Sequence, residues 1–208
     1  MAPVRRIANA QWATDFLQNT LDQNRSFSTI IICATRDSFL EQLAATVQLH
    51  SAEATGNHRL LAKSLGLLSR SHKVKTVFCP TLEHLRAYLS VGVQPEAPGA
   101  EGKKNRRSLL AILNPLSLHL PTLEFSAQGL SRTLASAVEV SYRANLDIVL
   151  CECQDALDPA NAESGEALWY VNVPLLSNSM RIGADWTGRS VPVKRVVERW
   201  FQFEGLTV

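Results

Sequence analysis

The sequence predicts a single α/β domain built on a mainly parallel β-sheet that is flanked by helices. Two observations support this prediction. Short apolar runs of strand length alternate with segments of helical periodicity, and several strand-like segments follow one another near the C-terminus. The composition agrees with a large core, because 46% of the 208 residues are hydrophobic and only 19% are charged, against a usual ~25%.

Four apolar runs form the predicted sheet, and each has the β-branched or aliphatic character of a strand buried on both faces. They cover residues 28–34, 74–79, 108–113 and 147–151. Helical patterns lie between them. One helix opens at Ser38 with a capping-box pattern and presents Leu40, Leu43, Ala44 and Val47 on one side. Others are expected over 82–89 and 130–145.

We expect one domain over residues 1–208, in which residues 1–27 form an N-terminal helical extension. Trp12, Phe16 and Leu17 mark the apolar side of that extension. From Leu168 onward no helical pattern is evident, and short strands alternate with turns. The strands expected there are Leu168–Val173, Ser179–Trp186 and Val193–Phe203. Consecutive strands favour antiparallel pairing, so the sequence predicts antiparallel strands at one edge of the parallel sheet.

The sequence indicates a soluble intracellular protein with no membrane partner. No run approaches the ~18 apolar residues of a membrane span. The arginines near the N-terminus are not followed by the apolar segment of a secretory signal. Four cysteines are too few for a disulfide scaffold and fit a reducing compartment.

Ligands of open parallel sheets bind at the carboxyl ends of the strands, so the residues that follow each strand are the ones to inspect. The turn Ala34–Ser38 contains neither the glycines nor the lysine of a phosphate-binding loop. Asn114, which follows the third predicted strand, is neutral where a nucleotide hydrolase needs a carboxylate to hold magnesium. We therefore predict no ATPase activity, no tight ATP binding and no cofactor.

Metal and hydrolase chemistry are also disfavoured. Cys33, Cys79, Cys151 and Cys153 follow strands but form no Cys-x₂-Cys pair, and Cys151 and Cys153 are expected to point opposite ways, so no metal site is predicted. The histidines lack the motifs of a zinc protease or a serine hydrolase. An enzyme on another α/β site stays open as an alternative, for which only Asp37, Glu152 and Asp155 are available at the strand ends.

Basic and aromatic residues suggest two surfaces. Nucleic-acid contacts are predicted at Lys103, Lys104, Arg106, Arg107, Arg189, Lys194 and Arg195, although solvated loops and protected edge strands use the same residues. Arginine and aromatic side chains are enriched in protein interfaces. Partner contacts are predicted at Trp12, Phe16, Trp186, Arg199 and Trp200, with Trp12 and Phe16 favoured, unless these aromatics cover the chain's own core.

The order of these segments resembles a RecA-like recombinase core that has lost its nucleotide motifs. Ile30–Cys33 is similar to the first core strand, and Leu109–Ser117 to the later motif strand, with Asn114 at its acidic position. Leu130–Asn145 is similar to the following helix, and Ile148–Gln154 to the strand that ends in Asn-Gln. The segment from Trp169 to Phe203 is similar to the closing β-strands.

The resemblance implies a RecA-like pseudo-ATPase domain, without a Walker A loop, that works in a heteromeric complex. Short degenerate relatives of this kind, such as Shu-complex subunits and the partner of the SWIM-domain protein, assist homologous recombination and DNA repair in the nucleus. The resemblance therefore implies a non-enzymatic accessory factor that pairs with another RecA-like or SWIM-type protein and binds DNA weakly. The alternative is an Elongator-type ring subunit, which would contact tRNA in the cytoplasm.

Overall fold

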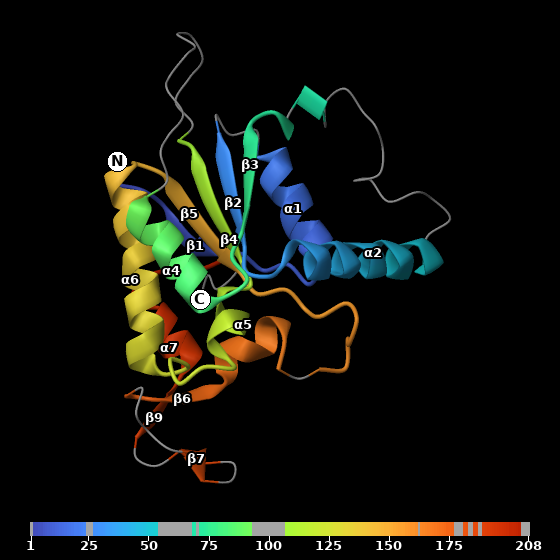
Figure 1. Cartoon of the computed structure of the whole chain (residues 1–208). Helices are drawn as coiled ribbons and strands as arrows, with labels where there is room; N and C mark the ends of the chain where they lie inside the picture. The colour runs from blue at the N-terminus through green and yellow to red at the C-terminus, as the bar shows by residue number, and fades with distance from the viewer. Residues whose placement is uncertain are drawn as a thin grey trace.

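In the computed structural model the chain forms a six-stranded sheet in which every pair of neighbouring strands is parallel (Figure 1). The structure describes residues 2–23, 27–53, 68–69, 71–92, 107–161, 163–176, 181–182, 185–186 and 189–204. The strand order is β10-β1-β5-β4-β2-β3. The strands are β1 (Arg5–Ile7), β2 (Ser28–Ile32), β3 (Val74–Phe78), β4 (Leu109–Leu113), β5 (Asp147–Cys151) and β10 (Gln202–Phe203).

Strands β2, β4 and β5 form the centre of the fold, and all five residues of each are buried. They lie in register, so that Ile32 pairs with Leu113 and Leu113 with Cys151. Their β-branched and aliphatic side chains fit a pleated surface that is covered on both sides. As a result the carboxyl ends of the three strands meet at one edge of the sheet.

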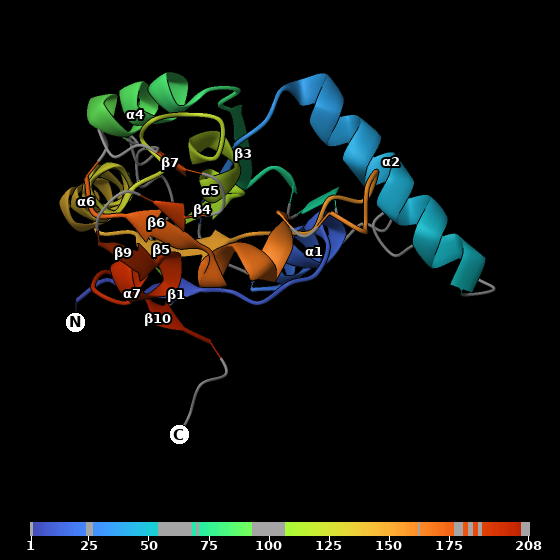
Figure 2. The ribbon, with the colours of Figure 1, turned by 90° about the horizontal axis from the view of Figure 1, so that it is seen from below.

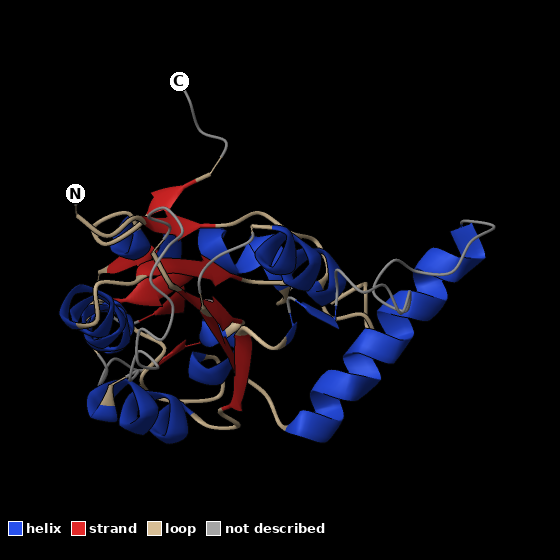
Figure 3. Cartoon of the chain, turned by 90° about the horizontal axis from the view of Figure 1, so that it is seen from above, coloured by secondary structure: helices blue, strands red, loops and turns tan. Residues whose placement is uncertain are grey.

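Helices cover both faces of the sheet (Figure 3). Helices α1 (Ala13–Asp22) and α2 (Arg36–Glu53) contribute to the core on one face. The opposite core holds side chains of α4 (Leu82–Val91), α5 (Pro115–His119), α6 (Ala127–Arg143), α7 (Val193–Val197) and a 3₁₀ helix over Gly165–Tyr170. In Figure 2, α2 extends well beyond the sheet.

The predicted α/β class and the sharing of one sheet by the four predicted core strands are confirmed. The antiparallel strands are also present, but they form two separate small sheets and do not extend the edge of the main one. One pairs β6 (Asn172–Pro174) with β9 (Ser190–Pro192), and the other pairs β7 (Arg181–Ile182) with β8 (Asp185–Trp186).

Three predicted elements need correction. Val193–Phe203 is not one strand: Val193, Val196 and Val197 form the buried side of helix α7, and only Gln202–Phe203 forms a strand, β10. Leu168–Val173 is not one strand either, because its first half ends the 3₁₀ helix and only Asn172 and Val173 belong to β6. The N-terminal segment is more than a helical extension, since β1 pairs with both β5 and β10 inside the sheet. A three-residue strand with one buried side chain leaves too short a pattern to recognise from sequence.

Helix α2 turns a different side toward the core than its apolar pattern predicts. Phe39 and Thr46 are buried, whereas Leu40 is 48% exposed and Ala44 is exposed as well. The side marked by Leu40, Leu43, Ala44 and Val47 is therefore not fully covered by the described residues.

Candidate functional site

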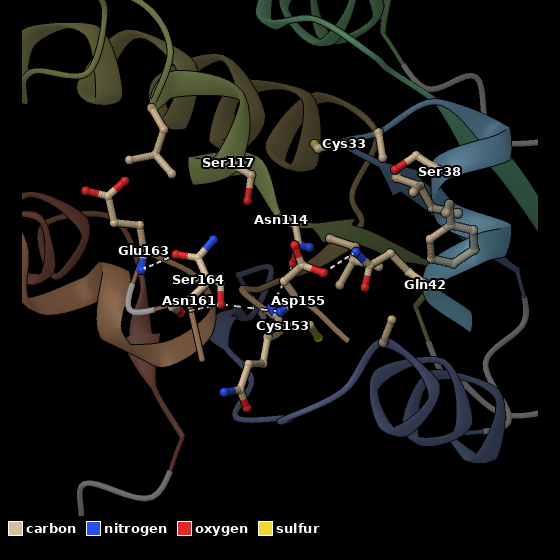
Figure 4. Close-up of a pocket in the computed structure, with 17 residues that line it drawn as sticks. Cys33, Ser38, Gln42, Asn114, Ser117, Cys153, Asp155, Asn161, Glu163 and Ser164 are labelled. Atoms are coloured by element: carbon tan, nitrogen blue, oxygen red, sulfur yellow. Dashed lines mark hydrogen bonds between the residues drawn. The ribbon is translucent and has the colours of Figure 1, made fainter. Parts of the chain in front are cut away.

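The carboxyl ends of β2, β4 and β5 border a cavity of about 270 Å³, which we call the polar crevice (Figure 4). Its walls come from the start of α2, the turn after β4 and the loop after β5. The polar side chains on these walls are Ser38, Gln42, Asn114, Ser117, Gln154, Asp155, Asn161, Glu163 and Ser164. No lysine or arginine is among its lining residues within the described part of the chain.

Asn114 joins the ends of two strands. Its backbone has φ 56°, a left-handed conformation that asparagine tolerates better than most residues. Its Oδ1 accepts a hydrogen bond of 2.7 Å from the Cys153 N–H, and its own N–H donates to the Cys151 carbonyl at 2.8 Å. The side chain that occupies the expected metal-side position is thus used to hold β4 against β5.

Gln42 and Asp155 tie the loop after β5 to helix α2. The Gln42 amide donates to Asp155 Oδ1, and Gln42 Oε1 accepts from the Ala156 N–H at 2.7 Å. Asp155 Oδ1 also accepts from the N–H groups of Leu157 and Asp158, at 2.9 and 3.3 Å. One oxygen of this carboxylate therefore orders the loop.

Glu152 is buried at the end of β5 and caps helix α5. Its carboxylate accepts from the Leu116 N–H at 2.5 Å and from the Ser117 hydroxyl at 3.4 Å. Burial raises the pKa of Glu152 well above its usual value, and the Leu116 hydrogen bond opposes that rise. With its exposed fraction at only 3%, Glu152 has a structural role in this edge of the sheet.

The helices that begin beside the crevice already have side-chain acceptors at their N-termini. The Trp12 N–H at the start of α1 donates to Asp15 Oδ2 at 3.3 Å, and the Ser38 N–H of α2 donates to the Thr35 hydroxyl at 3.2 Å. Glu152 does the same for α5. A phosphate binds helix N-termini through such free N–H groups and the positive helix dipole. Here side chains already occupy these positions, and the Asp15 carboxylate opposes an anion.

The strand-to-helix turns after β1 and β2 lack the features of a phosphate cradle. The turn Ala34–Ser38 contains no glycine or lysine, and neither does the turn from Ala8 to Trp12, which follows β1. The sequence analysis considered only the turn after β2, because it did not predict strand β1. Neither β1 nor β2 is followed by a turn with the composition of a phosphate-binding loop.

A second hollow, of about 230 Å³, lies at the carboxyl ends of β1, β5 and β10, and we call it the aromatic crevice. The Lys194 ammonium lies 5.2 Å from the ring centroids of both Tyr170 and Phe203. The rings of Trp169 and Phe203 meet edge-on at 5.5 Å. Lys194, a predicted nucleic-acid contact, is therefore half-buried and engaged in cation–π contacts within the chain.

Cys151 and Cys153 lie on the same side of β5, which corrects the expectation that they point apart. Residues two apart in extended chain share a face, and the two sulfur atoms are 3.6 Å apart. Their mutual hydrogen bond and burial raise the pKa of Cys153, and burial raises that of Cys33. These thiols are buried, and the described residues contain no cluster of three or more metal-ligating side chains.

The other predicted nucleic-acid residues differ in their availability. Arg189 and Arg195 are exposed. Arg107 is half-buried, donates to the Ala2 carbonyl and lies 3.8 Å from the Asp147 carboxylate. Lys103, Lys104 and Arg106 lie outside the described residues.

The predicted partner surface loses one of its two favoured residues. Phe16 is 2% exposed and packs in the core under α1, so its assignment to a partner is wrong. Trp12 is half-buried and meets the His50 ring edge-on at 6.5 Å. Arg199 is exposed and Trp200 is half-buried against the core. The Trp186 side chain lies outside the described part of the structure.

These features define a class: an α/β protein with a parallel sheet whose strand-end crevice is polar, acidic and without a phosphate cradle. The family model described as SPAC22G7.03-like matches residues 13–203, and the chain belongs to that family. No curated protein matches the sequence. None of the helices in the described ranges is both long enough and apolar enough to cross a membrane.

Proposed function

We propose that this protein is a non-catalytic, nucleotide-independent subunit of a heteromeric complex, a RecA-like pseudo-ATPase that assists homologous recombination and DNA repair in the nucleus. The observation that carries the proposal is the state of the helix N-termini at the strand ends. Thr35 and Glu152 accept hydrogen bonds from N–H groups in the first turns of α2 and α5, and Asp15 accepts from the Trp12 N–H directly before α1.

The electrostatics of the polar crevice support the same proposal. A magnesium nucleotide needs N–H groups and cations for its phosphates and a carboxylate for its metal. The described lining supplies carboxylates at Asp155 and Glu163 but no cation, and Asn114 uses its oxygen on the Cys153 backbone. A subunit that does not use a nucleotide at its contacts must associate through side-chain packing.

Direct DNA binding is proposed to be weak. Arg189 and Arg195 are exposed near the C-terminal end of the chain, whereas Lys194 and Arg107 are engaged within the fold. Two exposed cations among the described residues of the predicted contact set give few phosphate contacts, and hence a shallow dependence of affinity on salt. We expect the DNA affinity of the complex to come mainly from the partner.

The test is affinity purification of the full-length protein from its own cells, with partners identified by mass spectrometry. Recovery of a second RecA-like or SWIM-type recombination protein, in a stoichiometric complex, is the expected result. Recovery of Elongator subunits instead would overturn the recombination role and favour a tRNA-associated ring in the cytoplasm. A parallel titration with magnesium ATP should show no binding at micromolar concentration, and saturable binding there would overturn the nucleotide-independent part.

A further inference from the structure

We propose that the polar crevice is a binding site for an organic cation: a guanidinium or ammonium group carried on a short alkyl stem. The group could be supplied by a free small molecule or by a side chain of a partner protein, and the chemistry of recognition is the same. This inference does not rest on the recombination role, because it follows from the lining of the crevice alone.

Unused acceptors border the crevice. Only Oδ1 of Asp155 accepts hydrogen bonds from the described residues, so Oδ2 is left for a ligand. The exposed Glu163 side chain borders the crevice on the side away from Asp155, with its carboxylate turned outward (Figure 4), and this carboxylate has no described partner either. The described lining holds no lysine or arginine, so no described lining residue neutralises either carboxylate.

The crevice also has apolar lining residues, which suit the alkyl part of the ligand. They are Ala13, Ile32, Phe39, Leu113 and Leu120. A long cationic side chain or an alkylamine buries its methylene groups on such a surface while its charged end reaches polar groups. The cavity volume of about 270 Å³ equals that of roughly nine water molecules at ~30 Å³ each, which accommodates one such group and its stem.

Other classes of ligand fit less well. An anion would meet two carboxylates, and the α2 N-terminus beside the crevice is already capped by Thr35 and carries Asp37 in its first turn. A metal ion needs several convergent ligands, and the described residues contain no group of three. A delocalised or hydrogen-bonding cation needs fewer charged contacts and can also use the carbonyl and hydroxyl oxygens of Asn161, Ser38 and Ser117.

The experiment is isothermal titration of the full-length protein with two probes. Agmatine is a free guanidinium–ammonium compound with a four-carbon stem, and the blocked tripeptide acetyl-Gly-Arg-Gly-amide presents the same head group as a protein side chain. Butyrate serves as an anionic control of similar length. We expect saturable binding of at least one cationic probe and none of butyrate. Tighter binding of agmatine would indicate a small-molecule source, and tighter binding of the peptide a partner side chain.

Two substitutions locate the binding. Asp155→Asn keeps an oxygen for the Leu157 and Asp158 N–H groups but removes the charge, and it should weaken binding at least about tenfold. Asp158→Asn removes the same charge from an exposed neighbour outside the lining and should leave the affinity unchanged. If Asp155→Asn does not fold, as judged by its circular dichroism and melting curve, Glu163→Gln on the exposed wall carries the test. The proposal is overturned if neither cation binds up to about 10 mM, or if the Asp155 and Glu163 variants bind as well as the wild type.

Discussion

The two faces of the sheet differ in how completely the chain covers them. The closed face carries α4, α5, α6 and α7, whose side chains join one large core. The open face carries α1 and α2, and buries the smaller of the two cores. On the open face the Thr14 hydroxyl and Gln18 Oε1 are buried without a hydrogen-bond partner in the described structure, and Leu40 is half exposed.

On the closed face Trp200 Nε1 is likewise buried without a partner in the described structure, but a polar network joins three of the helices there. Arg86 of α4 donates to Thr133 Oγ1 at 3.0 Å and to the Glu124 carboxylate at 2.9 Å. His119 Nδ1 donates to the Glu124 carbonyl at 3.0 Å, and Nε2 lies 3.1 Å from Thr133 Oγ1. The network ties α4, α5 and α6 together. The comparison teaches that the closed face has the larger core and a polar network between its helices, and we expect a partner to bind the open face, which buries the smaller core.

The largest loss of stability is expected from a substitution in the core of the open face. Phe16→Ala removes a fully buried ring under α1 and should lower the free energy of unfolding by about 4 kcal/mol. Urea denaturation measures this loss, and Leu17→Ala, at a half-buried neighbour, is the control with a smaller loss. A loss below about 1 kcal/mol at Phe16 would mean that α1 is only loosely attached to the sheet.

The closed-face network predicts a stability that depends on pH. Burial lowers the pKa of His119 to about 4, from an ordinary 6.5. As the pH falls, the histidine of the unfolded chain takes up a proton before that of the folded chain. The contribution of neutral His119 to the free energy of unfolding is therefore fully present above about pH 6.5 and is lost as the pH falls to about 4. The full loss is roughly 3 kcal/mol.

His119→Gln should flatten this part of the profile, as measured by urea denaturation between pH 4 and 7. Glu152 acts in the opposite direction: its raised pKa means that stability falls as the pH rises above the ordinary carboxyl range. The difference between wild type and variant isolates the histidine, since Glu152 is present in both. If the free energy of unfolding of the variant depends on pH as steeply as that of the wild type, His119 is not the group responsible.

A substitution at Asn114 is expected to lower stability, because this residue links the ends of β4 and β5. Asn114→Ala leaves the left-handed backbone without a tolerant residue and the Cys153 N–H without its acceptor, at a combined cost of about 2 kcal/mol. Asn114→Asp keeps the acceptor and the backbone tolerance, so its unfolding free energy should stay within about 1 kcal/mol of wild type. The same aspartate variant should still not hydrolyse ATP, as a phosphate-release assay would show. Hydrolysis by it would contradict the absence of a phosphate cradle.

The central strands could be predicted from the sequence because each is a five-residue run that is wholly buried, as Leu109–Leu113 shows. Helix α7 could not, since Val193, Val196 and Val197 lie in a short segment that suits a strand almost as well. The hydrogen bonds that cap the strand-end helices could not be predicted from the sequence either. Glu152 and Leu116 are 36 residues apart, and their hydrogen bond depends on the pairing of β4 with β5.

The smallest effect on stability, and the sharpest test of the open face, is expected at Trp12. Its side chain is half-buried at the start of α1, where its main described ring contact is the edge-on approach to His50. Trp12→Ala should therefore cost only about 1 kcal/mol, or about 2–4 °C in melting temperature for a chain of this size. Aromatic anchors contribute strongly to binding when a partner desolvates them, so the same variant should recover much less partner in a pull-down.

Leu40→Ser, on the exposed side of α2, should also reduce partner recovery, with even less effect on the melting temperature. Arg199→Ala, at an exposed position next to the closed-face core, separates the two faces: partner recovery should survive it if the open face is the interface. A large drop in melting temperature at Trp12 with full partner recovery would show that this ring covers the chain's own core, and that the open face is not where the partner binds.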